Sequence, residues 1–222
     1  MSDRQNVLFV TIDQFRADCL FGALGDYVKL PNLRALMQDG VSFTQHFSVC
    51  APCGPSRASI LTGQYARNHR AVRNGTPLRR DTPNLATEVR KGGYLPLLFG
   101  YTDSAQDPRG MHPNDPALGT YEEVMPGFHE VLGMRGDDIG PWRADLVSKG
   151  YDVPPFPDIY RPGGDQIDDP AIYSAQDSDT AFMADAVIKD LAGRPEGWFA
   201  HVTFLRPHPP LGAPAPEHAG LE

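Results

Sequence analysis

Residues 6–12, Asn-Val-Leu-Phe-Val-Thr-Ile, form a continuous apolar run rich in β-branched side chains, and Asp13-Gln14 follows it directly. An uninterrupted run of this kind is typical of a strand buried on both faces, as in a parallel sheet. Parallel strands are joined by crossover connections, usually helices. This segment therefore favours an α/β fold over an all-β or an all-α fold.

The rest of the chain continues an alternation of strand and helix patterns. We expect further strands at 41–47, 94–100 and 197–205, and helices at about 31–39, 55–65, 82–91 and 175–192. This alternation predicts a mostly parallel sheet flanked by helices. Residues 102–170 are instead rich in Pro, Gly and Asp with little periodicity. Such a long irregular region is typical of functional loops, a lid or an oligomer contact, so a homo-oligomer is possible.

The composition fits one domain. With 222 residues and 41% hydrophobic content, the chain can bury one substantial core, and 22 glycines with 22 prolines indicate many loops. The sequence shows neither an N-terminal leader nor an apolar run long enough to cross a membrane, so we expect a cytoplasmic protein without a membrane partner. Three cysteines do not make a disulfide framework, and reduced thiols fit the cytoplasm.

The charge is unevenly distributed along the chain. The net charge is −8, yet residues 41–80 contain neither Asp nor Glu. Their basic or histidine side chains are Arg57, Arg67, Arg70, Arg73, Arg79, Arg80, His46 and His69. This local positive field suits a small anion. Because the whole chain is acidic and has no recognisable nucleic-acid-binding module, we expect no nucleic acid partner. Arg79 and Arg80 flank a turn, and a solvated face remains an alternative for them.

Residues 53–57, Cys-Gly-Pro-Ser-Arg, combine a potential nucleophile with a helix start and an arginine. Pro55 is favoured in the first turn of a helix, so Cys53 lies where free backbone N–H groups and the helix dipole attract negative charge. Arg57 follows one turn later on the same face. The motif therefore indicates chemistry on an anionic substrate.

Cys53 has other possible explanations. Cys50 and Cys53 form a C-x-x-C pair of the kind used in thiol redox centres. A redox centre does not require Pro55 or Arg57, however. A structural zinc site needs four ligands, and only Cys19 remains as a third thiol. The redox alternative stays open at this point.

The order Cys-x-Pro-Ser-Arg, followed by Leu-Thr-Gly at residues 61–63, resembles the motif of type I sulfatases and of the related phosphonate monoester hydrolases in the alkaline phosphatase superfamily. The resemblance implies that a formylglycine-generating enzyme oxidises Cys53 to formylglycine. The hydrated aldehyde then presents two hydroxyls: one, held on a divalent metal, attacks sulfur or phosphorus, and the other expels the product. It also implies that Arg57 neutralises the anion.

A metal site is expected where the first strand ends. Ligands of open α/β sheets gather at the carboxyl ends of strands, and Asp13-Gln14 offers hard oxygen donors suited to Ca²⁺, Mg²⁺ or Mn²⁺. Taken alone, an Asp after a strand is more often a helix cap or turn residue. The resemblance implies that Asp13, Gln14 and the formylglycine from Cys53 bind the metal. The run 13–18, Asp-Gln-Phe-Arg-Ala-Asp, is similar to that of phosphonate monoester hydrolases, although choline-sulfatase-like proteins also carry Asp-Gln.

Two further residues match substrate-binding positions of the family. Asn74 closes the segment 68–74, and the resemblance implies that it contacts the substrate anion; a turn with Gly75 is the alternative. Tyr101 stands at the carboxyl end of the strand at 94–100, where the family has a tyrosine beside the substrate. The phosphonate hydrolases continue with a threonine-rich run, whereas this chain has Asp103 there. Asp103 therefore marks a departure that bears on selectivity.

The strand at 197–205 leads into Arg206-Pro-His-Pro-Pro. His208 is held between prolines and is suited to give a hydrogen bond or a proton to the leaving oxygen, as the matching histidine of the family does. A structural histidine in a Pro-rich turn is the alternative. His201, within the strand, is expected to be a packing residue.

The resemblance runs along nearly the whole chain but covers only the N-terminal part of a typical family member. It implies that residues 1–222 are the N-terminal part of a sulfatase-like catalytic domain, with a fold that is incomplete at its C-terminus. The further metal ligands and the substrate-binding lysine of the family lie in its other half. We expect a metal- and formylglycine-dependent hydrolase of small anionic esters: phosphonate monoesters, phosphodiesters or sulfate esters. The alternatives are a truncated, non-catalytic anion-binding domain and a thiol redox protein that uses Cys50 and Cys53.

Overall fold

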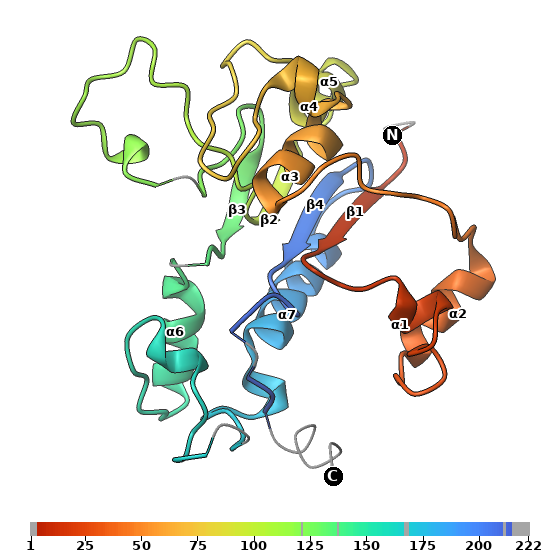
Figure 1. The fold of residues 1–222 in the computed structure, drawn as a ribbon, viewed down its shortest axis with the longest axis vertical. Coiled ribbons are helices and arrows are strands. Elements are labelled where there is room, and N and C mark those ends of the chain that lie inside the picture. Colours follow the sequence, from red (N-terminus) through yellow and green to blue (C-terminus); the bar gives the residue numbers. More distant parts are fainter. Residues whose placement is uncertain (1–3, 121, 137, 167–168, 211, 215–222) are drawn as a thin grey trace.

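The computed structural model describes residues 4–120, 122–136, 138–166, 169–210 and 212–214. Its centre is one sheet in the order β1-β4-β2-β3 (Figure 1). The strands are β1 (Val7–Ile12), β2 (Pro96–Gly100), β3 (His129–Gly133) and β4 (Phe199–Phe204). Every neighbouring pair in this sheet is parallel. The predicted parallel α/β architecture is therefore confirmed.

The helices connect and cover these strands. They are α1 (Asp18–Phe21), α2 (Pro31–Asp39), α3 (Cys53–Thr62), α4 (Ala66–His69), α5 (Leu85–Lys91), α6 (Gly140–Ser148) and α7 (Asp179–Ala192), with short 3-10 turns η1 (Pro116–Leu118), η2 (Asp158–Tyr160) and η3 (Ala175–Asp177). Local sequence explains several ends. Asn84 and Thr87 form a reciprocal capping box at the start of α5, and Gly63 ends α3 in a left-handed conformation.

The hydrophobic core lies between one face of the sheet and the pair α6 and α7. Alternate residues of the two central strands point into it, among them Leu97, Phe99 and Val202. Trp142 of α6 is fully buried there, with its ring 5.7 Å from that of Tyr160. The period-two alternation of the strands thus directs one set of side chains to this core.

The opposite face of the sheet is covered by α3. The buried side chain of Arg57 on α3 donates a hydrogen bond to Thr203 of β4 over 2.7 Å. Thr203 lies one residue from Val202 and therefore points to the other face. This packing brings the start of α3 to the carboxyl edge of the sheet.

The strand register sets the position of the site. Ile12 pairs with Phe204, and the amide of Asp13 donates to the Phe204 carbonyl over 3.0 Å, so the chain segments after β1 and β4 leave the sheet together. At the end of β2, Gly100 has φ of 102°, and a Cβ on it would lie 2.4 Å from the Thr203 carbonyl oxygen. Glycine is required here, because only its backbone can approach β4 so closely.

Two sequence predictions differ from the structure. Residues 41–47 form no strand, and Val41, Phe43 and Phe47 are exposed. Their alternation of apolar and polar residues resembles a strand, but the segment lies outside the sheet and finds no partner. Conversely, β3 and α6 occur inside the region 102–170 that we predicted to be irregular. The sequence of β3, His-Glu-Val-Leu-Gly, is too short and polar to stand out from loops.

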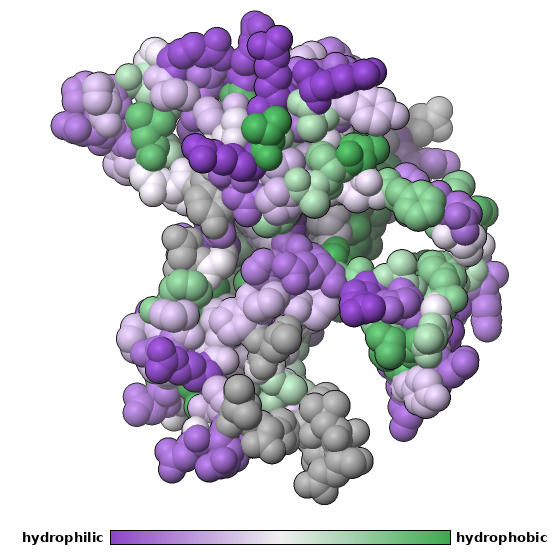
Figure 2. Space-filling model, in the orientation of Figure 1, coloured by the Kyte–Doolittle hydropathy of each residue, from purple (hydrophilic) through white to green (hydrophobic). Residues whose placement is uncertain are grey.

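Residues 16–49 form an arm that carries α1 and α2 and extends away from the sheet (Figure 1). Neither of these two helices has a buried residue. Figure 2 shows apolar side chains at the surface of this arm, where Tyr27 and Leu36 are exposed. Among the described residues, no helix is both long and apolar enough to traverse a lipid bilayer.

Candidate active site

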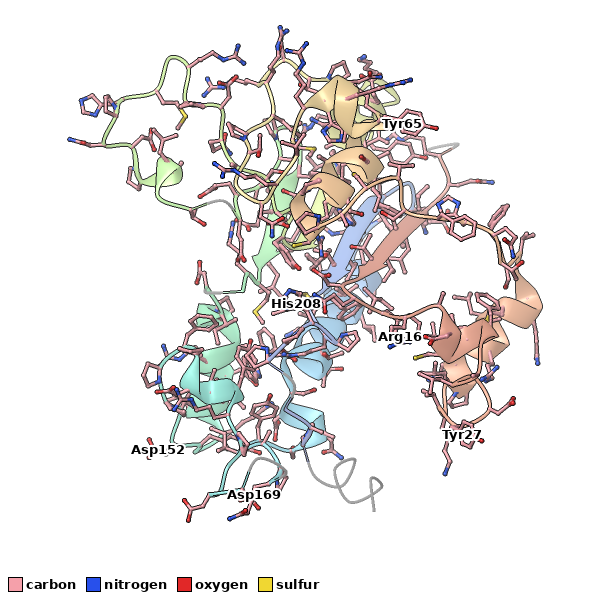
Figure 3. The ribbon with its side chains drawn as sticks, in the orientation of Figure 1. Arg16, Tyr27, Tyr65, Asp152, Asp169 and His208 are labelled. Carbon is pink, nitrogen blue, oxygen red and sulfur yellow. The ribbon has the colours of Figure 1, made fainter. Side chains whose placement is uncertain are left out.

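A cavity of about 370 Å³ opens at the carboxyl edge of the sheet. Five of the predicted site residues line it: Asp13, Cys53, Asn74, Tyr101 and His208. They come from the ends of β1, β2 and β4, from the start of α3 and from the loop after α4. Figure 3 shows His208 near the end of β4. The structure thus brings together residues that are widely separated in the sequence.

Cys53 begins α3 and is held there by Asn74. The side-chain amide of Asn74 donates from Nδ2 to the Cys53 sulfur over 3.1 Å, and its Oδ1 accepts from the backbone N–H of Gly54 over 3.0 Å. A Cβ on Gly54 would lie 3.0 Å from Asn74 Oδ1, so glycine allows this close approach. Asn74 is therefore part of the cavity and satisfies one free N–H group of the helix start.

The environment of Cys53 favours the neutral thiol. Burial raises the pKa of the Cys53 thiol, the negative charge of Asp103 raises it further, and the hydrogen bond from Asn74 lowers it in part. A reactive redox cysteine needs a lowered pKa, because the thiolate is the attacking species. The expected place at the helix start is observed, but the site does not stabilise a thiolate.

Arg57 lies beside the cavity rather than in its lining. Its side chain is 8% exposed and its guanidinium lies 4.2 Å from the centre of the Tyr101 ring. It donates to Asp13 Oδ2 over 3.2 Å, to the Tyr101 hydroxyl over 2.9 Å and to Thr203 over 2.7 Å. These contacts hold the ends of β1, β2 and β4 against α3 and place one positive charge behind the cavity.

Tyr101 completes this cluster. Its hydroxyl donates to Asp13 Oδ2 over 2.7 Å while it accepts from Arg57. Burial raises the pKa of Tyr101 far above its usual range, and the nearby positive charge of Arg57 opposes this shift only in part. The phenol therefore stays protonated at any physiological pH and acts as a hydrogen-bond donor.

The residues after β1 fit part of a metal site. Asp13 lines the cavity, whereas Gln14 is exposed, has φ of 56° and is not in the cavity lining. A carboxylate and an amide are donors that Ca²⁺, Mg²⁺ and Mn²⁺ prefer, so their chemistry fits a hard divalent cation. Among the described residues, no cluster of three or more His, Cys, Asp or Glu side chains could hold a metal ion. Of the two predicted ligands, the structure thus brings Asp13 into the cavity and leaves Gln14 outside its lining.

His208 has a defined tautomer. Its Nδ1 lies 2.7 Å from the carbonyl oxygen of Pro209, and its backbone N–H donates to the Leu205 carbonyl over 2.9 Å. A carbonyl oxygen can only accept, so Nδ1 carries the proton. Nε2 is then the ring nitrogen that Pro209 leaves available.

Arg206 supports His208, and the sequence analysis assigned it no role. Its guanidinium pairs with Asp179 at the start of α7 over 3.2 Å and lies 4.1 Å from the centre of the Tyr160 ring. It also donates from Nη1 to the His208 carbonyl over 2.7 Å. No local pattern could have indicated this role, because both Asp179 and Tyr160 are distant in the sequence.

Asp103 also lines the cavity, at the position where the sequence departs from the phosphonate hydrolases. Its side chain is buried, and its Oδ2 has no hydrogen-bond partner in the described part of the chain. Burial raises the pKa of its carboxyl group, while the positive charge of Arg57 lowers it in part. An acidic residue thus stands beside Cys53.

Cys50 belongs to a separate hydrogen-bond network. Its sulfur lies 3.2 Å from the carbonyl oxygen of Pro55 and 3.1 Å from the hydroxyl of Ser59, which in turn lies 2.8 Å from His69 Nε2. Both Cys50 and Cys53 are free thiols. Each therefore has its own partners, and the two do not form a disulfide in this structure.

The other arginines of residues 41–80 lie at the surface. Arg67, Arg70, Arg73, Arg79 and Arg80 are exposed, and Arg79 pairs with Asp81 over 2.6 Å. Arg57 is the member of this group that is buried beside the cavity.

Comparisons with known proteins agree with this fold. The family model for Sulfatase matches residues 5–219. The chain is 38% identical to the multifunctional alkaline phosphatase superfamily protein PehA of Trinickia caryophylli, covering 97% of this chain and 44% of the relative. It superposes with a TM-score of 0.93 and 60% identity on phosphonate monoester hydrolase SpPMH from Silicibacter pomeroyi. On the phosphonate monoester hydrolase of Agrobacterium radiobacter it superposes with a TM-score of 0.92 and 47% identity. In both structural matches, the alignment covers 97% of this chain and 44% of the other.

The fold and the cavity at its sheet edge define an α/β protein of the alkaline phosphatase-like type. The chain belongs to the sulfatase family. It spans less than half the length of the relatives that it matches.

Proposed function

We propose that this chain provides part of the active site of a metal- and formylglycine-dependent hydrolase of small anionic esters. The observation that carries the proposal is the position of Cys53, which starts α3 in a cavity shared with Asp13, Asn74 and His208. Two relatives named phosphonate monoester hydrolases are 60% and 47% identical, whereas an arylsulfatase of Clostridium perfringens is 25% identical. This difference favours phosphonate monoesters or phosphodiesters over sulfate esters.

The chain's own residues would bind and orient the ester. Asn74 presents an amide donor beside Cys53, and the start of α3 adds a positive dipole end, so a tetrahedral oxyanion is stabilised there. Tyr101 and Arg57 fix the carboxylate of Asp13. The resulting cluster is preorganised, because every member is held by the protein before substrate arrives.

Two groups would complete this chemistry. Oxidation of Cys53 to formylglycine would supply, as the hydrated aldehyde, the hydroxyl nucleophile. A divalent cation held by Asp13 and Gln14 would supply the positive charge that lowers the pKa of that hydroxyl.

His208 would act on the leaving oxygen. Its Nδ1–H is directed to the Pro209 carbonyl, so its Nε2 is the atom available for proton transfer. In the imidazolium form, Nε2–H donates a proton to the departing alkoxide or phenoxide, which makes it a better leaving group. The ring is held by Arg206 through the backbone of its own segment.

Maturation requires a partner, which we propose is a formylglycine-generating enzyme that recognises residues 53–57. The described cysteines are free thiols, and we propose the cytoplasm as the compartment. Assembly into a homo-oligomer is a further proposal, supported by the exposed apolar side chains of the arm.

The proposal is tested first by mass spectrometry of the tryptic peptide that ends at Arg57. Protein made together with a maturation enzyme is expected to carry Cys53 as formylglycine, about 18 Da lighter than cysteine. The matured protein is then assayed with phosphonate monoesters, phosphodiesters and sulfate esters in the presence of Ca²⁺, Mg²⁺ or Mn²⁺.

Two variants separate the hydrolase from the redox alternative. Cys53→Ser is expected to abolish hydrolysis, whereas Cys50→Ser leaves it largely intact, because Cys50 lies outside the cavity lining. Hydrolysis that persists in Cys53→Ser contradicts the proposed nucleophile. An unmodified Cys53 that forms a disulfide with Cys50 would support the redox alternative instead.

A further inference from the structure

Asp103 is a buried acidic residue whose carboxylate faces the nucleophile position. It follows Tyr101 by two residues, and the residue is 7% exposed although it lines the cavity. Its φ of 55° is left-handed, a conformation that Asp, Asn and Gly adopt more readily than other residues. The backbone therefore holds this side chain in a defined direction.

The side chain of Asp103 points toward the start of α3. A Cβ built on Gly54 would lie 3.6 Å from Asp103 Oδ2, and that same oxygen has no hydrogen-bond partner within the described residues. A buried polar oxygen without a partner costs free energy. The Cys53 thiol lies close enough that it and Asp103 shift each other's pKa, so a group that approaches Cys53 also meets this carboxylate.

The charges around the cavity define this interaction. Arg57 carries one positive charge and is paired with the negative charge of Asp13. Asp103 adds a second negative charge that no ion pair neutralises within the described residues. Glu122 and His208 also line the cavity, but the Asp103 carboxylate is the one directed to the start of α3, so an anion bound beside Cys53 is repelled by it. Since Coulomb repulsion scales with the product of charges, a doubly charged ligand is penalised about twice as strongly as a singly charged one.

We propose that Asp103 is a specificity-determining residue that makes this cavity select singly charged anions over doubly charged anions. The substrate class then rests on the proposed hydrolase function. Phosphonate monoesters, phosphodiesters and sulfate monoesters carry one negative charge at neutral pH and are accepted. Phosphate monoesters carry up to two and are disfavoured. The charge selection itself is a property of the cavity and does not depend on hydrolysis.

The first test uses the unmodified thiol of Cys53. In the full chain with Cys19→Ser and Cys50→Ser, Cys53 is the single thiol, and its alkylation rate is measured with anionic iodoacetate and neutral iodoacetamide. Both reagents attack the same thiolate, so the ratio of the two rates cancels the thiolate fraction and reports the local charge. We expect Asp103→Asn to raise the iodoacetate to iodoacetamide ratio by about fivefold or more.

Matched variants keep this test decisive. Asp103→Asn and Asp103→Gly both tolerate the left-handed φ, so at least one folded variant is expected, which circular dichroism verifies. Asp152→Asn removes an exposed negative charge that lies well away from His208 (Figure 3) and is expected to leave the ratio unchanged. An unchanged ratio in folded Asp103 variants, or an equal rise in Asp152→Asn, would overturn the proposal.

The second test uses the matured protein. The ratio of kcat/KM for a phosphodiester to that for the phosphate monoester with the same leaving group is expected to fall about fivefold or more in Asp103→Asn. An unchanged ratio contradicts the proposal. If the protein hydrolyses neither ester nor any other in the panel, the hydrolase function fails, while the alkylation ratio still decides the role of Asp103.

Discussion

The carboxylate of Asp13 and the guanidinium of Arg57 form an ion pair of 3.2 Å in which both side chains are less than one-tenth exposed. The pair joins the end of β1 to α3 and closes the back of the cavity. Removing one partner of a buried pair leaves an uncompensated charge, so its loss costs far more than its formation contributes.

Arg57→Met is therefore expected to destabilise the protein by about 3–5 kcal/mol, because Asp13 remains buried without its cation. The free energy of unfolding is measured by urea titration. The control is Arg79→Met, which removes an exposed pair with Asp81 and is expected to cost about 0–1 kcal/mol. If both variants lose the same free energy of unfolding, the buried Asp13–Arg57 pair stabilises the protein no more than the exposed pair does.

His201 gives the protein a pH-dependent stability. The ring is buried between Phe9 and Phe128, and burial lowers its pKa to about 3. Between the folded pKa and the ordinary value of 6.5, the unfolded chain binds a proton that the folded chain does not. Stability is therefore fully present above pH 6.5 and falls as the pH decreases. The slope from this one residue is about 1.4 kcal/mol per pH unit.

His201→Gln is expected to remove that slope. Unfolding free energies are compared at several pH values between 4.5 and 6, a window above the titration of the described carboxylates with lowered pKa. His69, whose pKa is also lowered by burial, contributes equally to both proteins and cancels in the comparison. His112→Gln, an exposed control, is expected to leave the slope unchanged. The same slope in His201→Gln and the parent would refute the assignment.

Asn74 opposes the rise in the pKa of the Cys53 thiol. Its hydrogen bond lowers the pKa of the Cys53 thiol against the larger effect of burial. Asn74→Ala is therefore expected to raise this pKa further, and the rate of alkylation by iodoacetamide at pH 8 should fall several-fold. The measurement is made over a pH series in protein that retains Cys53 as its single thiol. Asn68→Ala, an exposed control on α4, should leave the profile unchanged.

Much of the site could be predicted from the sequence, because the carboxyl ends of parallel strands lie at the same edge of a sheet. Asp13, Tyr101 and His208 each follow an apolar strand, and the register of β1, β2 and β4 brings them to one cavity. The family motif placed Cys53 at a helix start for a local reason, since Pro55 belongs in a first turn. Both inferences needed only short stretches of chain.

Other features depended on contacts that no local pattern encodes. The orientation of Arg57 toward Asp13 follows from the packing of α3 on β4, which a helix pattern does not specify. The segment 41–47 has the alternation of a strand but no neighbour to pair with, so its prediction was wrong. Gln14 follows Asp13 directly, yet its left-handed backbone leaves it outside the cavity lining.

Arg206 positions His208, and this relationship predicts a local loss of order when Arg206 is changed. The guanidinium pairs with Asp179, stacks on Tyr160 and donates to the His208 carbonyl, so it anchors the segment that carries the histidine. In Arg206→Gln these three contacts are lost together. The hydrogen bond from the His208 amide to the Leu205 carbonyl should then open more often.

Amide exchange of His208 measured by NMR reports this opening directly, and we expect its protection to fall by about tenfold or more in Arg206→Gln. Arg161→Gln serves as the control, because Arg161 makes an exposed pair with Asp158 and is expected to leave the His208 amide unchanged. Exchange within the core strand β4, for example at Val202, separates local from global opening. If Val202 loses as much protection as His208, the effect of Arg206 is global destabilisation, and the positioning role is rejected.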